Sequence, residues 1–165
     1  MTTLPDWRFM LRHPAHLIAL GLGSGLAPKA PGTFGTLAAL PLYALFLDLG
    51  LTPLWVAVLL LPAFVLGCWA CQRTGDALGV PDHGAMVWDE MVAMWGVLAA
   101  LPATPLAWLL GFGLFRLFDI VKPWPIRWLD ARVKGGFGVM LDDVLAALMA
   151  WLTYLALVNL AGLPG

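Results

Sequence analysis

The chain has 165 residues, of which 61% are hydrophobic and only 12% are charged. Soluble domains contain about 45–50% apolar and roughly 25% charged residues, so this composition excludes an ordinary soluble domain and predicts a membrane protein. The formal net charge of -1 provides no excess of cations for a polyanion, which argues against nucleic acid as a partner. The length suits a single domain covering residues 1–165, and no linker or internal repeat divides it.

The first polar feature along the chain is a glycine-rich segment, residues 21–36, that leads directly into an apolar stretch. Glycines let backbone N–H groups approach an anion, the hydroxyls of Ser24, Thr33 and Thr36 add donors, and a helix N-terminus adds partial positive charge. The segment is therefore a candidate phosphate cradle. A flexible loop at the membrane entry, with Thr36 as the N-cap of the next helix, explains the same residues.

Prolines divide the apolar part of the chain into helices, because proline ends helices and disfavours helix in the residue before it. Turns at 48–53 and 102–105 separate the segments. We expect an all-α, polytopic membrane helix bundle of four to five short helices, at residues 36–49, 54–71, 87–101, 105–120 and 142–161. Most of them, at about 14 to 18 residues, are short for a hydrocarbon core of about 30 Å, so re-entrant or half-inserted helices fit the pattern as well as full spans.

Basic residues predict on which side of the membrane the loops lie. If both turns face one side, all nine Lys and Arg residues fall on the other, within residues 1–35, 72–88 and 116–143. The positive-inside rule makes that side cytoplasmic. Near the N-terminus of the chain, residues 7–12 combine aromatic and basic side chains. This fits either a helix that lies in the membrane interface or a frayed end.

Two acidic pairs, Asp89-Glu90 and Asp142-Asp143, stand on this same side where apolar stretches begin. Carboxylates at a membrane surface lose hydration, which is unfavourable unless a cation lies beside them. Helix capping by Asp89 is the alternative for one pair. Two pairs on two helices that enter from one side favour shared binding of a cation.

The chemistry is narrowed by what the sequence lacks: a Cys-x5-Arg loop, an Asp-x-Asp-x-Thr motif and a His-rich lipid-phosphatase signature. Carboxylates, a basic loop and a glycine-rich segment remain, and together they suit metal-assisted hydrolysis. Hard oxygen ligands favour Mg²⁺ over zinc. In the basic loop, Arg116 and Asp119 lie one helical turn apart, so a structural ion pair is the alternative explanation for Asp119.

Three blocks of residues carry a family resemblance. They are Gly23-Ser24-Gly25-Leu26 with Pro31-Gly32-Thr33-Phe34-Gly35, then Val87-Trp88-Asp89-Glu90, then Phe115-Arg116-Leu117-Phe118-Asp119 with Lys122-Pro123-Trp124-Pro125 and Gly135-Gly136-Phe137-Gly138 to Asp142-Asp143. Jointly they resemble the bacterial phosphatidylglycerophosphatase A family over residues 16–160. Ala93 and Ala147 depart from the family pattern, which has glycine at both positions.

The resemblance implies an integral, multi-pass enzyme of the bacterial inner membrane, a Mg²⁺-dependent lipid phosphatase whose site faces the cytoplasm. Its phospholipid substrate would be phosphatidylglycerophosphate, and its products phosphatidylglycerol and phosphate. We expect the metal ligands to be Asp89, Glu90, Asp142 and Asp143, with Asp119 as a further acid and one acid as general base. We expect phosphate to be bound by Ser24, Lys29, Thr33, Thr36, Arg116 and Lys122.

A transporter or channel is the alternative from a different class, with the acids lining a cation path. Such proteins usually place ionisable groups near the bilayer midplane. Here the interiors of the expected helices hold none.

Overall fold

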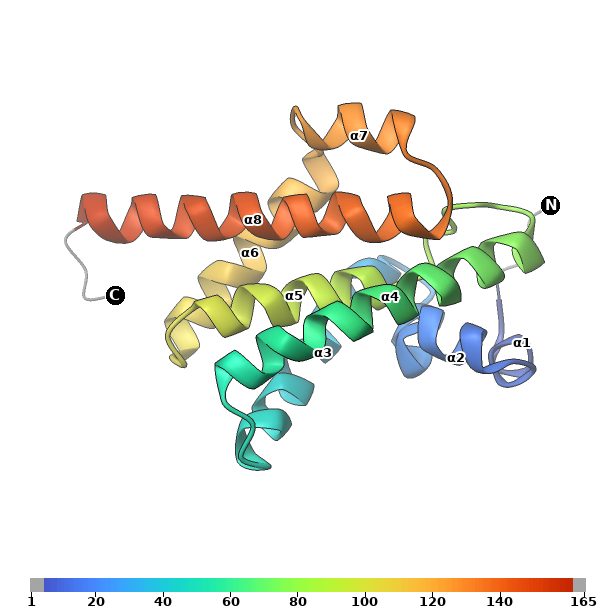
Figure 1. Cartoon of the computed structure of the whole chain (residues 1–165), viewed down its shortest axis with the longest axis horizontal. Coiled ribbons are helices and arrows are strands. Elements are labelled where there is room, and N and C mark those ends of the chain that lie inside the picture. The colour runs from blue at the N-terminus through green and yellow to red at the C-terminus, as the bar shows by residue number, and fades with distance from the viewer. Residues whose placement is uncertain (1–4, 162–165) are drawn as a thin grey trace.

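The computed structural model describes residues 5–161, and within them all the regular elements are helices, joined by short connections, without a β-strand. The elements are α1 (Trp7–Leu11), α2 (Pro14–Ala19), the 3-10 segment η1 (Gly21–Leu26), α3 (Pro31–Asp48), α4 (Pro53–Leu78), α5 (Trp88–Ala100), α6 (Pro105–Val121), α7 (Ile126–Arg132) and α8 (Gly135–Ala161) (Figure 1). The all-α class is confirmed. Five of these helices correspond to the five expected ones, and the other elements are short.

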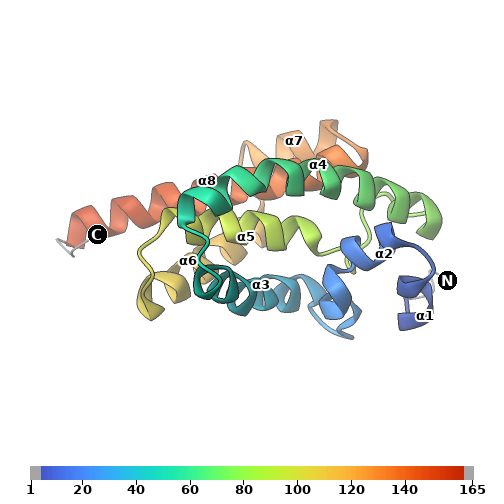
Figure 2. The ribbon, with the colours of Figure 1, turned by 60° about the horizontal axis from the view of Figure 1, so that its bottom comes forward.

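The helices are arranged around α5, which contacts α3, α4, α6 and α8. Figure 2 shows α4 and α8 on one side of α5 and α3 and α6 on the other. Most residues of α5 are buried, Met91, Met94 and Leu98 almost completely. A helix that is apolar all round is expected in this central place, because each of its faces meets another helix.

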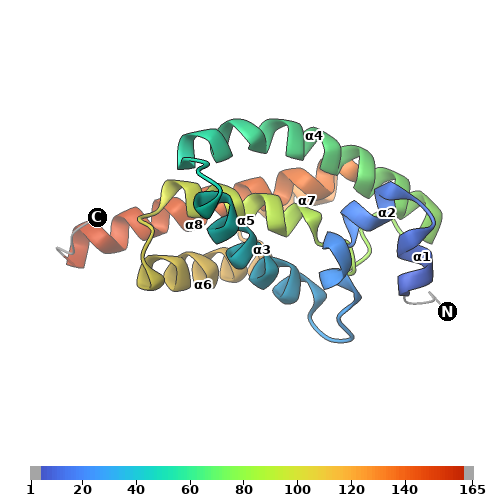
Figure 3. The ribbon, with the colours of Figure 1, turned by 90° about the horizontal axis from the view of Figure 1, so that it is seen from below.

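The helices that carry the polar motifs begin or end at the same end of the bundle. There α3, α5 and α8 begin and α4 and α6 end, close to α1, α2 and α7 (Figure 1). The turns after α3 and after α5 lie toward the opposite end (Figure 3). This arrangement agrees with the division of loops that the basic residues indicate.

Three helix boundaries differ from the expected ones, and the first is the start of α3. The helix begins at Pro31 rather than at residue 36. Proline is favoured at the first helical position, where its fixed φ is suitable and its missing N–H is not needed. Thr36 therefore lies inside the helix, where its Oγ1 donates to the carbonyl oxygen of Gly32 at 2.8 Å. The expectation that Thr36 is an N-cap is wrong.

The other two boundaries concern α4 and α8, which are both longer than expected. Hydropathy located the apolar core of α4, but the helix continues through polar residues to a left-handed glycine cap, Gly79, with φ 70°. α8 begins at Gly135 rather than at residue 142. A Cβ at Gly136 would collide with the carbonyl oxygen of Cys68, so this glycine lets the first turn of α8 pack directly on the α4 backbone.

Two of the described helices, α4 and α8, are long and apolar enough to cross a bilayer. They have 26 and 27 residues and expose large apolar side chains on their outer faces, such as Leu61 (71%) and Leu152 (51%). Extended apolar surface of this kind marks contact with lipid or with a partner. The fold is therefore that of a membrane-associated helical protein. Residues 162–165 of the last apolar stretch lie outside the described part.

Candidate metal centre and phosphate site

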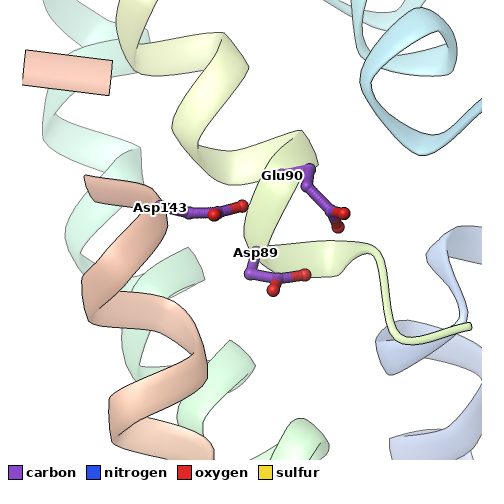
Figure 4. A group of neighbouring side chains, drawn as sticks. All are labelled: Asp89, Glu90 and Asp143. Atoms are coloured by element: carbon purple, nitrogen blue, oxygen red, sulfur yellow. The ribbon is translucent and has the colours of Figure 1, made fainter. Parts of the chain in front are cut away.

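Three buried carboxylates converge between α5 and α8. Asp89 and Glu90 lie in the first turn of α5, and Asp143 lies two turns into α8. One oxygen from each side chain lies within 4.8 Å of the other two. Figure 4 shows Asp143 pointing from α8 toward the start of α5, where Asp89 and Glu90 lie. We refer to these three residues as the carboxylate group.

Contacts with α4 and α2 fix the two helix ends that carry the carboxylate group. The indole nitrogen of Trp88 donates to the carbonyl oxygen of Ala63 at 3.1 Å, and the N–H of Val87 donates to that of Ala19 at 2.8 Å. On α8, the N–H of Gly136 donates to Oε1 of Gln72 at 2.9 Å. Helix α4 thus supports the start of both α5 and α8.

The carboxylates are not used for capping. The N-cap of α5 is Val87, and its side chain accepts no capping hydrogen bond. Asp89 Oδ1, Glu90 Oε2 and Asp143 Oδ2 are buried and have no hydrogen-bond donor among residues 5–161. Buried charges are normally paired or bound to a metal. Three inward-facing hard oxygen donors with free lone pairs fit a divalent cation such as Mg²⁺ or Ca²⁺.

Arg116 brings a positive charge to the edge of the carboxylate group. Its guanidinium forms an ion pair with Asp119, as the one-turn spacing predicts, and lies 3.7 Å from Oε1 of Glu90. The first turn of α3 closes the same edge, because a Cβ at Gly32 would collide with Glu90 Oε1 and lie 3.2 Å from the Arg116 nitrogens. The missing side chain of Gly32 therefore lets the first turn of α3 pack directly against Glu90 and the Arg116 guanidinium.

Asp142 has a different environment from its neighbour. Its Oδ2 accepts a hydrogen bond from Lys122, whose ammonium also lies 3.6 Å from Asp130 Oδ1. Burial disfavours the charge on Lys122, but the hydrogen bond and the negative charges of Asp142 and Asp130 outweigh it and raise the lysine pKa. Three of the four expected metal ligands thus come together, and Asp142 is turned to Lys122.

The glycine-rich segment reaches the carboxylates only through its last part. Ser24 Oγ donates to the carbonyl oxygen of Gly21 at 2.8 Å, and Thr36 is fully buried against Gly32. Lys29 is exposed to solvent and Thr33 is half-buried. Of the expected phosphate-binding residues, Arg116 is the one that the structure places beside the carboxylate group.

The sequence patterns did not predict that Gln72 and Asp130 take part in the contacts around the site. Gln72 holds the start of α8 and also donates to Asp76 at 2.9 Å, while Asp130 lies beside Lys122. Neither belongs to a polar pair or to a glycine-rich segment. The contact of Gln72 with Gly136 joins residues 64 positions apart, and that of Asp130 with Lys122 crosses from one helix to the next, so the pattern within one helix could not reveal them.

The fold and the site define a class: a membrane-associated helical protein whose buried carboxylate group could hold a metal ion, with an arginine at its edge. The family model described as Phosphatidylglycerophosphatase A matches residues 17–158. The chain belongs to the phosphatidylglycerophosphatase A family, as its motifs indicate.

Named relatives agree with this family. A Haemophilus influenzae protein named phosphatidylglycerophosphatase A is 46% identical over 154 residues, covering 93% of this chain and 94% of the relative. An Escherichia coli protein of the same name is 44% identical over 144 residues, covering 87% and 83%. A Bacteroides thetaiotaomicron protein, provisionally named a phosphatidylinositol-3-phosphatase, is 41% identical over 143 residues, covering 82% and 88%. No solved structure matches the chain.

Proposed function

We propose that this chain is a Mg²⁺-dependent phosphatase that hydrolyses phosphatidylglycerophosphate to phosphatidylglycerol and phosphate. The names of the relatives from H. influenzae and E. coli support the reaction. The observation that carries the chemistry is the carboxylate group, with three buried oxygens that have no donor among the described residues.

In this proposal Asp89, Glu90 and Asp143 hold the Mg²⁺. When bound, the ion supplies a Lewis acid for the phosphate oxygens and neutralises charge that develops during phosphoryl transfer. Asp142 contributes indirectly, because its ion pair keeps Lys122 charged and fixed at the end of α6. The buried, unpartnered Oδ1 of Asp142 leaves it as a further ligand if the side chain turns.

The protein's own residues bind and orient the phosphate. Arg116 is oriented by Asp119 and donates to phosphate oxygens, for which a planar guanidinium is well suited. Gly32 lets the first turn of α3 approach Glu90 and Arg116 closely, which fixes the edge of the site. A carboxylate accepts a proton from a water molecule while the oxygen of that water bonds to phosphorus. The bond from phosphorus to the glycerol oxygen breaks, and that oxygen takes up a proton as the alcohol leaves.

The proposal includes a multi-pass arrangement in the inner membrane with the site on the cytoplasmic side. The supporting observations are the two long apolar helices and the position of the basic residues near the ends of α4, α6 and α8 that flank the site. A reactive-cysteine scan of Lys29→Cys and Asp48→Cys in intact cells and in inverted vesicles tests this orientation. Both residues are exposed and lie at opposite ends of α3.

The reaction is tested by measuring phosphate release from phosphatidylglycerophosphate by the purified protein in detergent micelles. We expect release with Mg²⁺, loss after treatment with EDTA and recovery when Mg²⁺ is added again. Release that persists in EDTA would contradict the metal assignment. Absence of release under every divalent ion, together with cation flux in liposomes, would favour a transporter instead.

A further inference from the structure

An apolar groove lies between α3 and α6 and extends to the turn at residues 103–105, and its lining residues Leu37 and Phe112 are one to two helical turns from Gly32 and Arg116. Its volume is about 490 Å³, and its walls include Leu37 and Leu40 of α3 and Trp108, Leu109 and Phe112 of α6. No charged side chain lines it. A volume of this size lies within the range of small-molecule sites, about 300–1,000 Å³.

The register of the two helices aligns the groove with the phosphate site. Gly32 at the start of α3 lies against Arg116 near the end of α6. Eight residues further along α3 is Leu40, and eight residues back along α6 is Trp108, both in the wall of the groove. Eight residues of α-helix span about 12 Å. Arg116, Phe112 and Trp108 are spaced four apart, so they share one face of α6.

A second cavity extends the groove around α3. Its volume is about 520 Å³, its walls include Ser24, Phe34 and Ala38, and it shares Leu37 with the first cavity. Leu37 therefore stands at the junction of two apolar spaces. One space leads toward the glycine-rich segment and the other leads along α6.

We propose that the groove between α3 and α6 binds an acyl chain of the lipid substrate while the terminal phosphate lies at Arg116 and the carboxylate group. This inference rests on the proposed phosphatase function. The occupant must carry an anion and an apolar chain on one molecule, because an anion-binding end and an apolar groove follow one another along the same helix pair. A free phosphate or a water-soluble phosphate ester satisfies only the first of these.

In this proposal, substrate affinity and the chemical step depend on different residues. The groove contributes to the affinity for long-chain lipid, because apolar burial scales with the buried area, whereas the chemical step depends on the carboxylates and Arg116. Filling the groove should therefore raise KM for the diacyl substrate and leave kcat nearly unchanged. It should not affect a substrate that has no acyl chain.

The test compares Leu37→Trp with Leu152→Trp, since the two leucines are equally exposed (50% and 51%) and only Leu37 lines the groove. Both variants and the wild type are assayed in the same detergent micelles. The substrates are long-chain phosphatidylglycerophosphate and its deacylated form. We expect L37W to raise KM for the diacyl substrate about tenfold, with the deacylated substrate unaffected, and L152W to behave as the wild type.

Each other outcome has a defined meaning. Equal loss on both substrates, or no loss on either, overturns the groove as an acyl site. A wild-type protein that hydrolyses neither substrate overturns the proposed function instead. If L37W fails to fold, Leu109→Trp fills the same groove from α6. A photoreactive acyl chain on the substrate then provides a measurement on the wild type, in which labelling of α4 or α8 rather than α3 and α6 rejects the proposal.

Discussion

Asp142 and Asp143 are neighbours in sequence, yet they lie in two regions with opposite electrostatics. Asp143 faces Asp89 and Glu90 across the gap to α5, where no lysine or arginine is paired with it among the described residues. Asp142 forms an ion pair with Lys122. Consecutive residues of a helix point about 100° apart, so one acidic pair serves both regions.

The difference shows how a site can keep negative charge available for an added cation. Where the protein supplies its own cation, as at Lys122, the carboxylate is already neutralised. In the carboxylate group three acids share one nearby cation, Arg116 at 3.7 Å from Glu90, and one oxygen of each acid has no donor among the described residues. An uncompensated buried charge costs several kcal/mol. Binding of a divalent cation would remove this cost, so folding stability and metal affinity should be coupled in this region and independent in the other.

The largest effect is expected for Asp143→Asn, which removes one charge and one ligand from the carboxylate group. We expect at least about a thousandfold loss of kcat, because several kcal/mol of charge stabilisation is lost at about 1.4 kcal/mol per factor of ten. Phosphate release during a Mg²⁺ titration measures it. The matched control is Asp48→Asn, an exposed aspartate at the far end of α3. Activity within tenfold of wild type in D143N would contradict the metal site.

A smaller loss is expected when a methyl group displaces the side chains at the edge of the carboxylate group. Gly32→Ala places a methyl group against Glu90 Oε1 and the Arg116 guanidinium, so we expect kcat/KM to fall about a hundredfold, by about 2.7 kcal/mol. The control is Gly113→Ala on α6, where an added Cβ would meet nothing within 4 Å. Equal activity of G32A and G113A would show that the close packing of α3 against Glu90 and Arg116 does not matter for the reaction.

Asp142→Asn should have a milder effect of a different kind. Losing the pair with Lys122 leaves that lysine without its closest partner, so we expect about 1–3 kcal/mol less stability and about a tenfold loss of kcat/KM. The Mg²⁺ affinity should stay within about twofold, since Asp142 is turned to Lys122 and lies outside the carboxylate group. Thermal melting in detergent and Mg²⁺ titrations measure both quantities.

The double variant D142N/K122Q tests the pair directly. It leaves no unpaired buried charge, so its stability should be higher than that of D142N alone, which is a non-additive result. A loss of Mg²⁺ binding in D142N as complete as in D143N would contradict the division between the two aspartates and return Asp142 to the ligand set.

Patterns of neighbouring residues were sufficient to predict most of the helices of this protein. Apolar stretches and prolines located α4, α5 and α6 to within a few residues, except at the polar end of α4. The spacing of Arg116 and Asp119 indicated an ion pair as one of two explanations for Asp119, and the pair is present. Both depend on residues within one helix, where hydropathy and helical periodicity act directly.

Features that depend on distant contacts were not predictable in the same way. The extra turns at the start of α8 depend on Gly136 packing against Cys68, far away in the chain. Which face of α8 meets α5 depends on its contacts with α4, α5 and α6, and these place Asp143 toward α5 and Asp142 toward Lys122. The residues of the candidate site were therefore visible in the sequence, but their assignment to one region or the other was not.

The smallest effect concerns a buried polar group outside both regions. His16 on α2 lies 2.9 Å from Thr74 Oγ1 of α4 and stacks on Phe9. Burial lowers its pKa, and the positive charges of His13 and Arg73 lower it further. A histidine that is harder to protonate when folded contributes its full stability above about pH 6.5, the unfolded value, and loses it as the pH falls toward its lower folded pKa.

The expected result is a lower melting temperature of the wild type in detergent below about pH 6.5, and a weaker fall in His16→Gln, which keeps a polar partner for Thr74 without a titrating ring. The carboxylate group contributes equally to both proteins, so the difference between their melting curves isolates His16. The Mg²⁺ dependence of activity should be the same in both, because α2 holds none of the proposed ligands. An unchanged pH dependence in H16Q would show that the contact between α2 and α4 does not respond to this proton.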